Sequence, residues 1–348
     1  MVAFDDNGKI DILGLLPEEL EAEILKLGEK KFRAGQIFDW LHVKRVSSFD
    51  EMTNLSVQLR NLLNEKFCLK SLFVSKKLES HTDNTVKYLY ELSDGNHVEC
   101  VMMEYKHGNS LCISTQVGCK MGCRFCASTI AGFKRNLLPS EMLLQIYTAE
   151  KESGKHVDSL VLMGIGEPLD NFDNVVKFLQ LLSYETGKNM SLRHVSLSTC
   201  GLVNRIYDLA EYKFGLTLSI SLHAVTDKKR SEIMPVNNRF CISELLQACR
   251  DYIDKTGRRI SFEYSVIHGV NDSPEDAAGL IKLLKNMNCH VNLIPVNEIK
   301  ERDFKADRKS LEKFEEMLIK GGLNATTRRT LGADINAACG QLRREYEI

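Results

Sequence analysis

The sequence predicts an α/β protein built on a partial, TIM-like (β/α)6 barrel, with a small N-terminal helical domain and a β-hairpin extension. Strand and helix patterns alternate from Leu111 onward, which is typical of a parallel sheet covered by helices. About six such units fit into this stretch, whereas a closed barrel has eight strands. The first 75 residues carry helical patterns and no alternating strand pattern.

The chain divides into three predicted parts. Residues 1–75 are expected to form the helical accessory domain, in which Pro17 lies near the first turn of the first helix. Residues 76–104 are expected to form a linker and the β-hairpin, because two strand patterns flank the turn residues 94–96, Asp-Gly-Asn. Residues 105–348 are expected to form the partial barrel, followed by a C-terminal segment.

Helix-boundary residues and the hydrophobic period locate the barrel elements. Ser273 followed by Pro274 predicts a helix start, and Gly321 with Gly322 predicts a helix end. Apolar residues on one helical face predict a helix over residues 174–182. The predicted strands are short apolar runs, and they cover residues 111–115, 159–163, 194–198, 216–222, 260–266, 290–295 and 324–328.

Composition and charge narrow the class of protein. The chain has 348 residues, of which 43% are hydrophobic and 27% charged, which is enough for a large core and excludes a disordered chain. No apolar stretch approaches about eighteen residues, and the acidic N-terminus lacks the apolar region of a signal peptide. We therefore expect a cytoplasmic protein that does not enter a membrane. The net charge of -1 mildly disfavours a nucleic-acid binder.

Eleven cysteines, an odd number, argue against a disulfide framework and favour metal or redox chemistry. Cys119, Cys123 and Cys126 show C-x3-C-x2-C spacing in a glycine-containing loop after a predicted strand. Zinc sites and ordinary [4Fe–4S] clusters usually take four protein ligands, so three cysteines leave one iron open, for example to S-adenosylmethionine (SAM). The alternatives are simple burial and a zinc site completed by Cys112 or His107. Other cysteines are expected to be packing residues, namely Cys68, Cys200, Cys241, Cys249 and Cys289.

Several segments carry a resemblance to a known family. The cysteine loop, with Phe125 before its last cysteine, resembles that of the radical SAM superfamily, and residues 163–169 resemble the superfamily's GGEP segment. Together with further segments, they are similar to the RlmN/Cfr family of RNA adenine methyltransferases over nearly the whole chain. These further segments are residues 116–119, 132–137, 196–199, 219–224, 269–273, 292–297 and 332–342. The resemblance implies a partial barrel of the radical SAM type.

The resemblance implies a stepwise reaction that uses a [4Fe–4S] cluster on the three cysteines and two SAM molecules per turnover. One SAM methylates Cys339, and a radical formed from the second takes a hydrogen atom from that methyl group. The resulting carbon radical adds to adenine C2, Glu99 removes the C2 proton, and Cys112 attacks Cys339, which leaves a transient disulfide. Without the resemblance, Glu99 would be expected to face solvent and both thiols to be packing residues.

The resemblance also suggests which residues hold SAM. Glu167, which follows Gly166, is expected to accept a hydrogen bond from the methionyl amine. Five residues after later strands are expected to hold the ribose and the adenine, namely Ser198, Ser221, Leu222, His223 and Asn297. For His223, the alternative is a structural histidine whose hydrogen bonds are satisfied.

Two features favour the RlmN enzymes, which methylate C2, over the Cfr enzymes, which methylate C8. Pro168 matches RlmN enzymes, and residues 32–41 and 52–56 resemble their accessory domain. We therefore expect C2 methylation of 23S rRNA and some tRNAs, an electron donor such as flavodoxin, and a monomer. The N-terminal domain and Arg328-Arg329 are expected to hold the RNA, with the adenine flipped into the barrel mouth. The alternatives are C8 methylation, another radical SAM reaction and a non-catalytic zinc-binding RNA module.

Overall fold

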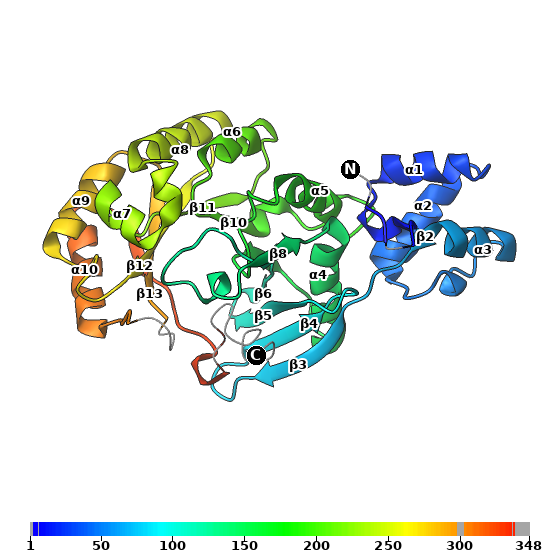
Figure 1. Ribbon diagram of the computed structural model, residues 1–348, viewed down its shortest axis with the longest axis horizontal. Coiled ribbons are helices and arrows are strands. Elements are labelled where there is room, and N and C mark those ends of the chain that lie inside the picture. The colour runs from blue at the N-terminus through cyan, green and yellow to red at the C-terminus, as the bar shows by residue number, and fades with distance from the viewer. Residues whose placement is uncertain (1–2, 6, 298–302, 336, 338–348) are drawn as a thin grey trace.

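The computed structural model describes residues 3–5, 7–297, 303–335 and 337. A curved ten-stranded sheet forms its centre, in the order β14-β13-β12-β11-β10-β9-β6-β5-β4-β3, and helices lie on the outer side of the curve (Figure 1). The strands from β6 to β14 pair in parallel. They are β6 (Gly108–Cys112), β9 (Ser159–Leu162), β10 (Val195–Thr199), β11 (Thr217–Ser221), β12 (Ile260–Val266), β13 (Cys289–Pro295) and β14 (Ala325–Thr327).

Helical crossovers connect these parallel strands, as parallel pairing requires. In the described part of the chain, β6 and the five strands from β9 to β13 are each followed by at least one helix, and β14 ends the series. The predicted partial barrel of six strand–helix units is therefore confirmed. The helices are α4 (Pro139–Ser153), α5 (Phe172–Ser183), α6 (Val203–Glu211), α7 (Asp227–Ile233), α8 (Ile242–Thr256), α9 (Pro274–Leu284) and α10 (Arg308–Lys320).

The hairpin lies where the turn residues predicted it, and it forms part of the main sheet. Strands β4 (Val86–Glu91) and β5 (His97–Tyr105) pair antiparallel, and β5 continues into the barrel sheet by pairing with β6. A further strand, β3 (Phe73–Glu79), pairs with β4 at the sheet edge. The sequence analysis missed β3, whose lysines and lack of any buried residue are typical of an edge strand.

The N-terminal part contains the predicted helices α1 (Pro17–Lys26), α2 (Phe32–Asp39) and α3 (Val57–Lys66), and a short parallel pair joins β1 (Ile10–Asp11) to β2 (Phe67–Cys68). A π-helical turn (Trp40–Lys44) extends α2. Polar contacts bind this part to the helices α4 and α5 of the barrel. They join His42 Nδ1 to the Tyr147 hydroxyl (3.1 Å), Arg45 to Glu150 (2.7 Å) and Lys177 to Glu19 (2.6 Å).

Local signals set the predicted helix ends. The Ser273 side chain accepts a hydrogen bond from the Asp276 N–H at 3.2 Å, and Pro274 is the first residue of α9, as the sequence predicts. Helix α10 ends at Lys320, directly before Gly321. None of the helices that the structure describes is long and apolar enough to cross a membrane.

A small hairpin carries the cysteine loop. Strands β7 (Gln116–Gly118) and β8 (Phe133–Asn136) pair antiparallel, and the three cysteines lie in the loop between them. Gly118 has a φ of +78°, and a Cβ atom at this position would lie 1.7 Å from the carbonyl oxygen of Gly132. The ends of the loop therefore approach each other more closely than any side chain at residue 118 would permit.

Replacement of Gly118 by alanine tests this close approach. Gly118→Ala should lower the free energy of unfolding by about 3 kcal/mol or more, because it adds a steric clash to the strain of a positive φ. The matched control is Gly154→Ala, since Gly154 has a φ of +66° and no atom within 4 Å of its added Cβ. Urea denaturation measures both variants, and equal stability of the two would contradict the argument.

Candidate active site

The carboxyl ends of the parallel strands surround a pocket of about 490 Å³, where (β/α) barrels place their chemistry. Leu222 is fully buried and does not line this pocket, and Cys339 lies outside the described residues. The predicted site residues that do line it are Glu99, Cys112, Cys119, Cys123, Cys126, Gly166, Glu167, Ser198, Ser221, His223 and Asn297.

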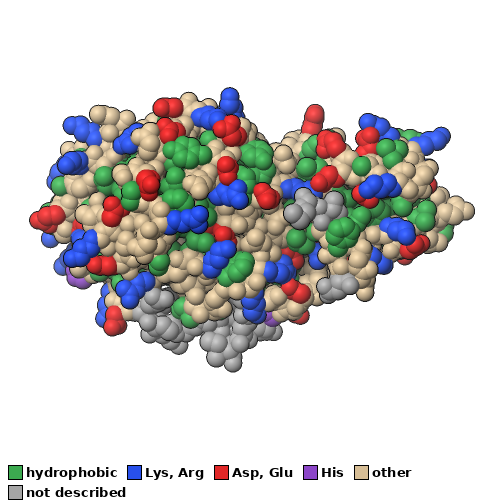
Figure 2. Space-filling view, turned by 45° about the horizontal axis from the view of Figure 1, so that its top comes forward, with side chains coloured by type: hydrophobic (Ala, Val, Ile, Leu, Met, Phe, Trp, Pro, Cys, Tyr) green, Lys and Arg blue, Asp and Glu red, His purple; other side chains and the backbone are tan. Residues whose placement is uncertain are grey.

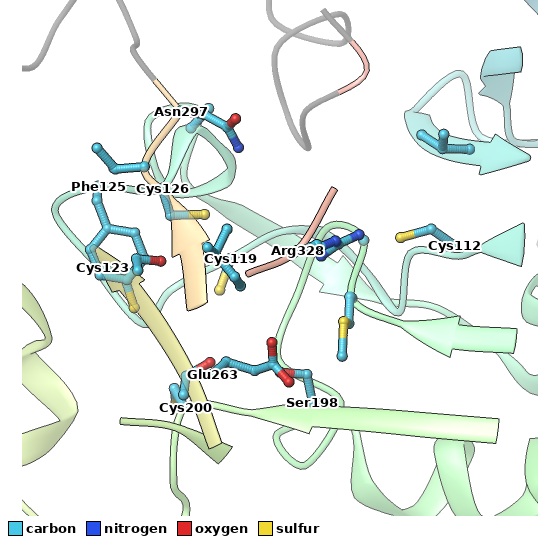
Figure 3. Close-up of a pocket in the computed structure, with 18 of the residues that line it drawn as sticks. Cys112, Cys119, Cys123, Phe125, Cys126, Ser198, Cys200, Glu263, Asn297 and Arg328 are labelled. Atoms are coloured by element: carbon cyan, nitrogen blue, oxygen red, sulfur yellow. The ribbon is translucent and has the colours of Figure 1, made fainter. Parts of the chain in front are cut away.

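The three loop cysteines border the same part of the pocket (Figure 3). Burial raises the pKa of the Cys119 thiol to about 12 and raises the pKa of Cys123 still further. Buried thiols of this kind lose their protons when they bind a metal cation, because the cation supplies the charge that the surroundings lack. The donor set therefore suits soft metal binding by thiolates, as an iron–sulfur cluster requires.

The described residues do not form a ready-made site for a single metal ion. Within the described residues, no three His, Cys, Asp or Glu side chains are grouped as a single metal ion requires. A [4Fe–4S] cluster needs a wider triangle of sulfur atoms, because each thiolate binds a different iron. Two contacts support the loop: Arg124 N–H donates to Ile233 O at 2.8 Å, and the Thr129 hydroxyl donates to Cys126 O at 2.9 Å.

Glu167 is buried in the loop that follows β9, and its carboxylate is held by the backbone. The N–H groups of Cys200 and Leu169 donate to it at 2.7 and 3.0 Å, while burial raises the pKa of the carboxyl group. Gly166 has a φ of +114°, and a Cβ there would lie 2.7 Å from the side chain of Gln116. Glu167 is thus fixed against β7 at the edge of the cysteine loop.

His223 combines a structural contact with a place in the pocket wall. Its Nδ1 accepts a hydrogen bond from the Ser265 N–H at 2.8 Å, so the proton of the neutral ring is assigned to Nε2. Burial lowers the pKa of His223 to about 3, which keeps the ring neutral. The ring packs edge-on against Phe125 of the cysteine loop, at 4.8 Å between centroids. The residue therefore has a satisfied structural bond and also contacts the loop.

Glu99 faces the pocket from β5 and forms a buried ion pair. The Lys87 ammonium lies 3.0 Å from the Glu99 carboxylate, and the two side chains are 0% and 2% exposed. In the β4–β5 register, Lys87 is opposite Val101 and Glu99 is opposite Leu89, which places both charged side chains on one face of the sheet. The solvent-facing alternative for Glu99 is therefore wrong.

Cys112 lies at the end of β6, opposite Val101 of β5, and lines the pocket on the same side as Glu99. Burial raises the pKa of the Cys112 thiol to about 11, and the nearby positive charge of Arg328 partly offsets this increase. Figure 3 shows the Arg328 guanidinium directed toward Cys112 across the pocket. The arrangement gives Cys112 a cationic neighbour that favours its thiolate form.

The sequence analysis missed several pocket residues. Glu263 on β12 is buried, accepts hydrogen bonds from Asn292 (2.6 Å) and Ser261 (3.0 Å), and lines the pocket. Cys200, expected to be a packing residue, lines it as well. A signal for Glu263 was present, because Ser261, Glu263 and Ser265 alternate along a strand whose other residues are apolar. Polar residues at every second position indicate a pocket-facing side of a buried strand.

An open parallel barrel with a three-cysteine loop at its strand ends defines the radical SAM class of enzyme. Residues 113–281 match the family model of the radical SAM superfamily, and residues 10–69 match that of the ribosomal RNA large subunit methyltransferase N-terminal domain. The solved structure of a radical SAM methyltransferase from Sphaerobacter thermophilus is similar, with a TM-score of 0.90 and 39% identity, over 95% of this chain and 98% of that one.

Two curated relatives identify the family to which this chain belongs within the radical SAM superfamily. A protein of Lachnoclostridium phytofermentans is 54% identical over 97% of this chain and 95% of its own length. A protein of Clostridium perfringens is 53% identical over 97% of both chains. Both are named "Probable dual-specificity RNA methyltransferase RlmN". The chain belongs to the RlmN family of the radical SAM superfamily, whose members use a [4Fe–4S] cluster and SAM.

The pKa of Cys112 predicts how fast its thiol reacts. Alkylation of Cys112 by iodoacetamide should rise about tenfold per pH unit between pH 7 and pH 10, because the thiolate fraction rises as the pH approaches about 11. Arg328→Met should slow the reaction at a fixed pH, because it removes the nearby positive charge. Peptide mass spectrometry measures the labelling of Cys112. Arg329→Met, with the same loss of charge, is the control, and an equal effect of both variants would refute the role of Arg328.

The buried ion pair predicts an energetic coupling between Lys87 and Glu99. Lys87→Met should destabilise the fold by about 3 kcal/mol, because it removes the ammonium from beside a buried carboxylate. The double variant Lys87→Met/Glu99→Gln should recover part of this loss, because it removes the buried negative charge as well. Urea denaturation of the two single variants and the double variant provides the test, and additive losses would show that the pair is not coupled.

Proposed function

We propose that this chain methylates C2 of adenine in 23S rRNA and in tRNAs, with the methyl group carried on Cys339. By its family, the chain is a SAM-dependent RNA methyltransferase of the radical SAM superfamily. One observation supports the methyl-cysteine mechanism: Glu99 and Cys112 line the same pocket as the cysteine loop. A radical SAM reaction of another kind needs the loop but has no use for this additional carboxylate and thiol.

The proposed mechanism assigns a separate task to each of these residues. When bound at Cys119, Cys123 and Cys126, the cluster together with two SAM molecules supplies the methyl group and the radical chemistry. The Glu99 carboxylate, held by Lys87, accepts the proton from adenine C2. The Cys112 thiolate then attacks the sulfur of Cys339, and the bond from that sulfur to the transferred carbon breaks. The carbon keeps the bonding electron pair and takes up a proton to become the methyl group, and a thiol reductant restores both cysteines.

The residues proposed to hold SAM surround the cysteine loop. Gly166, Glu167, Ser198, Ser221, His223 and Asn297 all line the pocket. Glu167 already accepts two backbone hydrogen bonds, which orient its carboxylate for a third donor such as the methionyl amine. Leu222 has no pocket-facing side chain, and we propose that it contributes only through the backbone.

RNA contact is proposed at the pocket rim and on residues 1–75, the accessory domain. Arg328 and Arg329 line the pocket and can neutralise phosphates beside a flipped adenine. Figure 2 shows basic side chains interspersed with acidic ones over the face in view rather than one continuous basic patch. Local contacts at the rim therefore suit this chain, whose net charge is -1, better than a broad electrostatic surface.

Further parts of the proposal concern organisation and partners. Residues 76–104 would join the accessory domain to the catalytic part, 105–348, and extend its sheet. An enzyme that acts on rRNA and tRNA needs access to the cytoplasm, so we propose a cytoplasmic location. Because the reaction consumes an electron, we also propose a donor such as flavodoxin, with the enzyme acting as a monomer.

Anaerobic reconstitution with iron, sulfide, SAM and a reductant, followed by nucleoside analysis of an RNA substrate, tests the proposed function. Wild-type protein should bind about four irons per chain and form 2-methyladenosine. Cys339→Ala should abolish methylation and leave the iron content unchanged, because it removes only the methyl carrier. Cys241→Ala, a thiol that does not line the pocket, is the matched control and should retain activity.

Each alternative predicts a different result from this experiment. Formation of 8-methyladenosine would indicate Cfr-type chemistry. Stoichiometric zinc in place of iron would indicate a zinc-binding module. Normal methylation by Cys339→Ala would refute the methyl-cysteine mechanism.

A further inference from the structure

We propose that the turn between β3 and β4 acts as a clasp for the C-terminal segment, with Asp334 as the positioning residue that aligns Cys339 with the pocket. The role of Cys339 rests on the proposed function. Figure 1 shows residues 331–335, the described start of this segment, beside the turn, although the two are about 250 residues apart in the sequence.

Three groups of the turn donate hydrogen bonds to the Asp334 carboxylate. The Ser80 hydroxyl lies 2.8 Å from Oδ1, and the His81 N–H lies 2.9 Å from Oδ2. The Thr82 hydroxyl contacts Oδ1 at 3.4 Å. The hydrogen bonds from His81 and Ser80 hold the pKa of Asp334 below its ordinary value, so the carboxylate is ionised at neutral pH. An ionised carboxylate with several donors is a strong and directional contact.

A second contact fixes the segment two residues earlier. The Gly332 N–H donates to the Asp83 carboxylate at 2.7 Å, and Asp83 also accepts from the Thr85 N–H at 3.1 Å. Gly332 has a φ of +61°, and a Cβ there would lie 3.0 Å from the Thr85 side chain and 2.5 Å from Ala337. The segment therefore packs directly against the turn. Asp334 of the segment accepts hydrogen bonds from the turn, and Asp83 of the turn accepts one from the segment.

The clasp has a functional consequence because the segment forms part of the pocket wall. Leu331, Gly332, Ala333 and Ala337 line the pocket, and Ala337 stands two residues before Cys339 in the sequence. In the proposed reaction, Cys339 must meet SAM, the adenine and Cys112 in turn. An anchor five residues before this cysteine limits the space that its thiol samples, which raises the frequency of productive encounters.

The test follows the first step of the reaction, S-methylation of Cys339, in reconstituted full-length protein without RNA. Asp334→Asn retains the size of the side chain but replaces one acceptor oxygen with an NH₂ group. Its single-turnover rate constant for S-methylation at saturating SAM, here called kcat, should fall about tenfold or more with an unchanged KM for SAM, because the segment is misplaced while the SAM site is intact. The iron content should stay at the wild-type value.

Two further variants separate the clasp from a general effect of charge. Ser80→Ala should lower the same kcat, and Ser80→Ala combined with Asp334→Asn should cost less than the product of the two single effects, because both remove one shared contact. Asp303→Asn, which removes the charge of another exposed aspartate, is the matched control and should behave as wild type.

The outcomes distinguish the clasp from the proposed function. A wild-type rate of Cys339 methylation in Asp334→Asn would overturn the clasp and leave the proposed function standing. A raised KM for SAM or a loss of iron would also overturn it, because Asp334 would then act on cofactor binding or on the fold. Failure of the wild-type protein to methylate Cys339 would overturn the proposed function, and the clasp with it.

Discussion

The close approach of Gly118 to the carbonyl of Gly132 is the contact on which the active site depends. It closes the ends of the loop that carries Cys119, Cys123 and Cys126, and it exists only because residue 118 has no side chain. Once the loop is closed in this way, its middle folds over the ends of the parallel strands. The Arg124 contact to the end of α7 then holds it against the barrel. Three thiols separated along the chain thereby border one pocket.

Three glutamates line the pocket, and each has a partner that compensates for its burial. Glu167 is held by backbone N–H groups, Glu263 by Asn292 and Ser261, and Glu99 by the Lys87 ammonium. Because a buried charge is costly unless it is paired, these contacts allow the protein to keep reactive groups in a water-poor site. The same contacts fix the direction in which each group points.

The antiparallel strands extend the barrel sheet and bring further chemistry to it. Through β5 they place Glu99 beside the barrel strand β6, whose last residue is Cys112, and both side chains line the pocket of the cysteine loop. Through the turn between β3 and β4 they contact the segment that leads to Cys339. A barrel of parallel strands alone would provide the cysteine loop and Cys112 without the neighbouring carboxylate of Glu99. The extension is therefore as important to the site as the barrel itself.

The sequence by itself determined the order of the strands and helices, the six barrel units and the cysteine loop, because hydrophobic period, caps and ligand spacing are local properties. It did not reveal that the hairpin joins the main sheet, that β3 lengthens it, or that Leu222 points away from the pocket while Cys200 lines it. Strand pairing and the Lys87–Glu99 pair join residues of different strands, which only tertiary contacts bring together. The side chain that faces the pocket at a strand end is equally hard to predict, because a shift of one residue reverses the exposed face. Those long-range contacts, which the local pattern cannot encode, decided how the site is assembled.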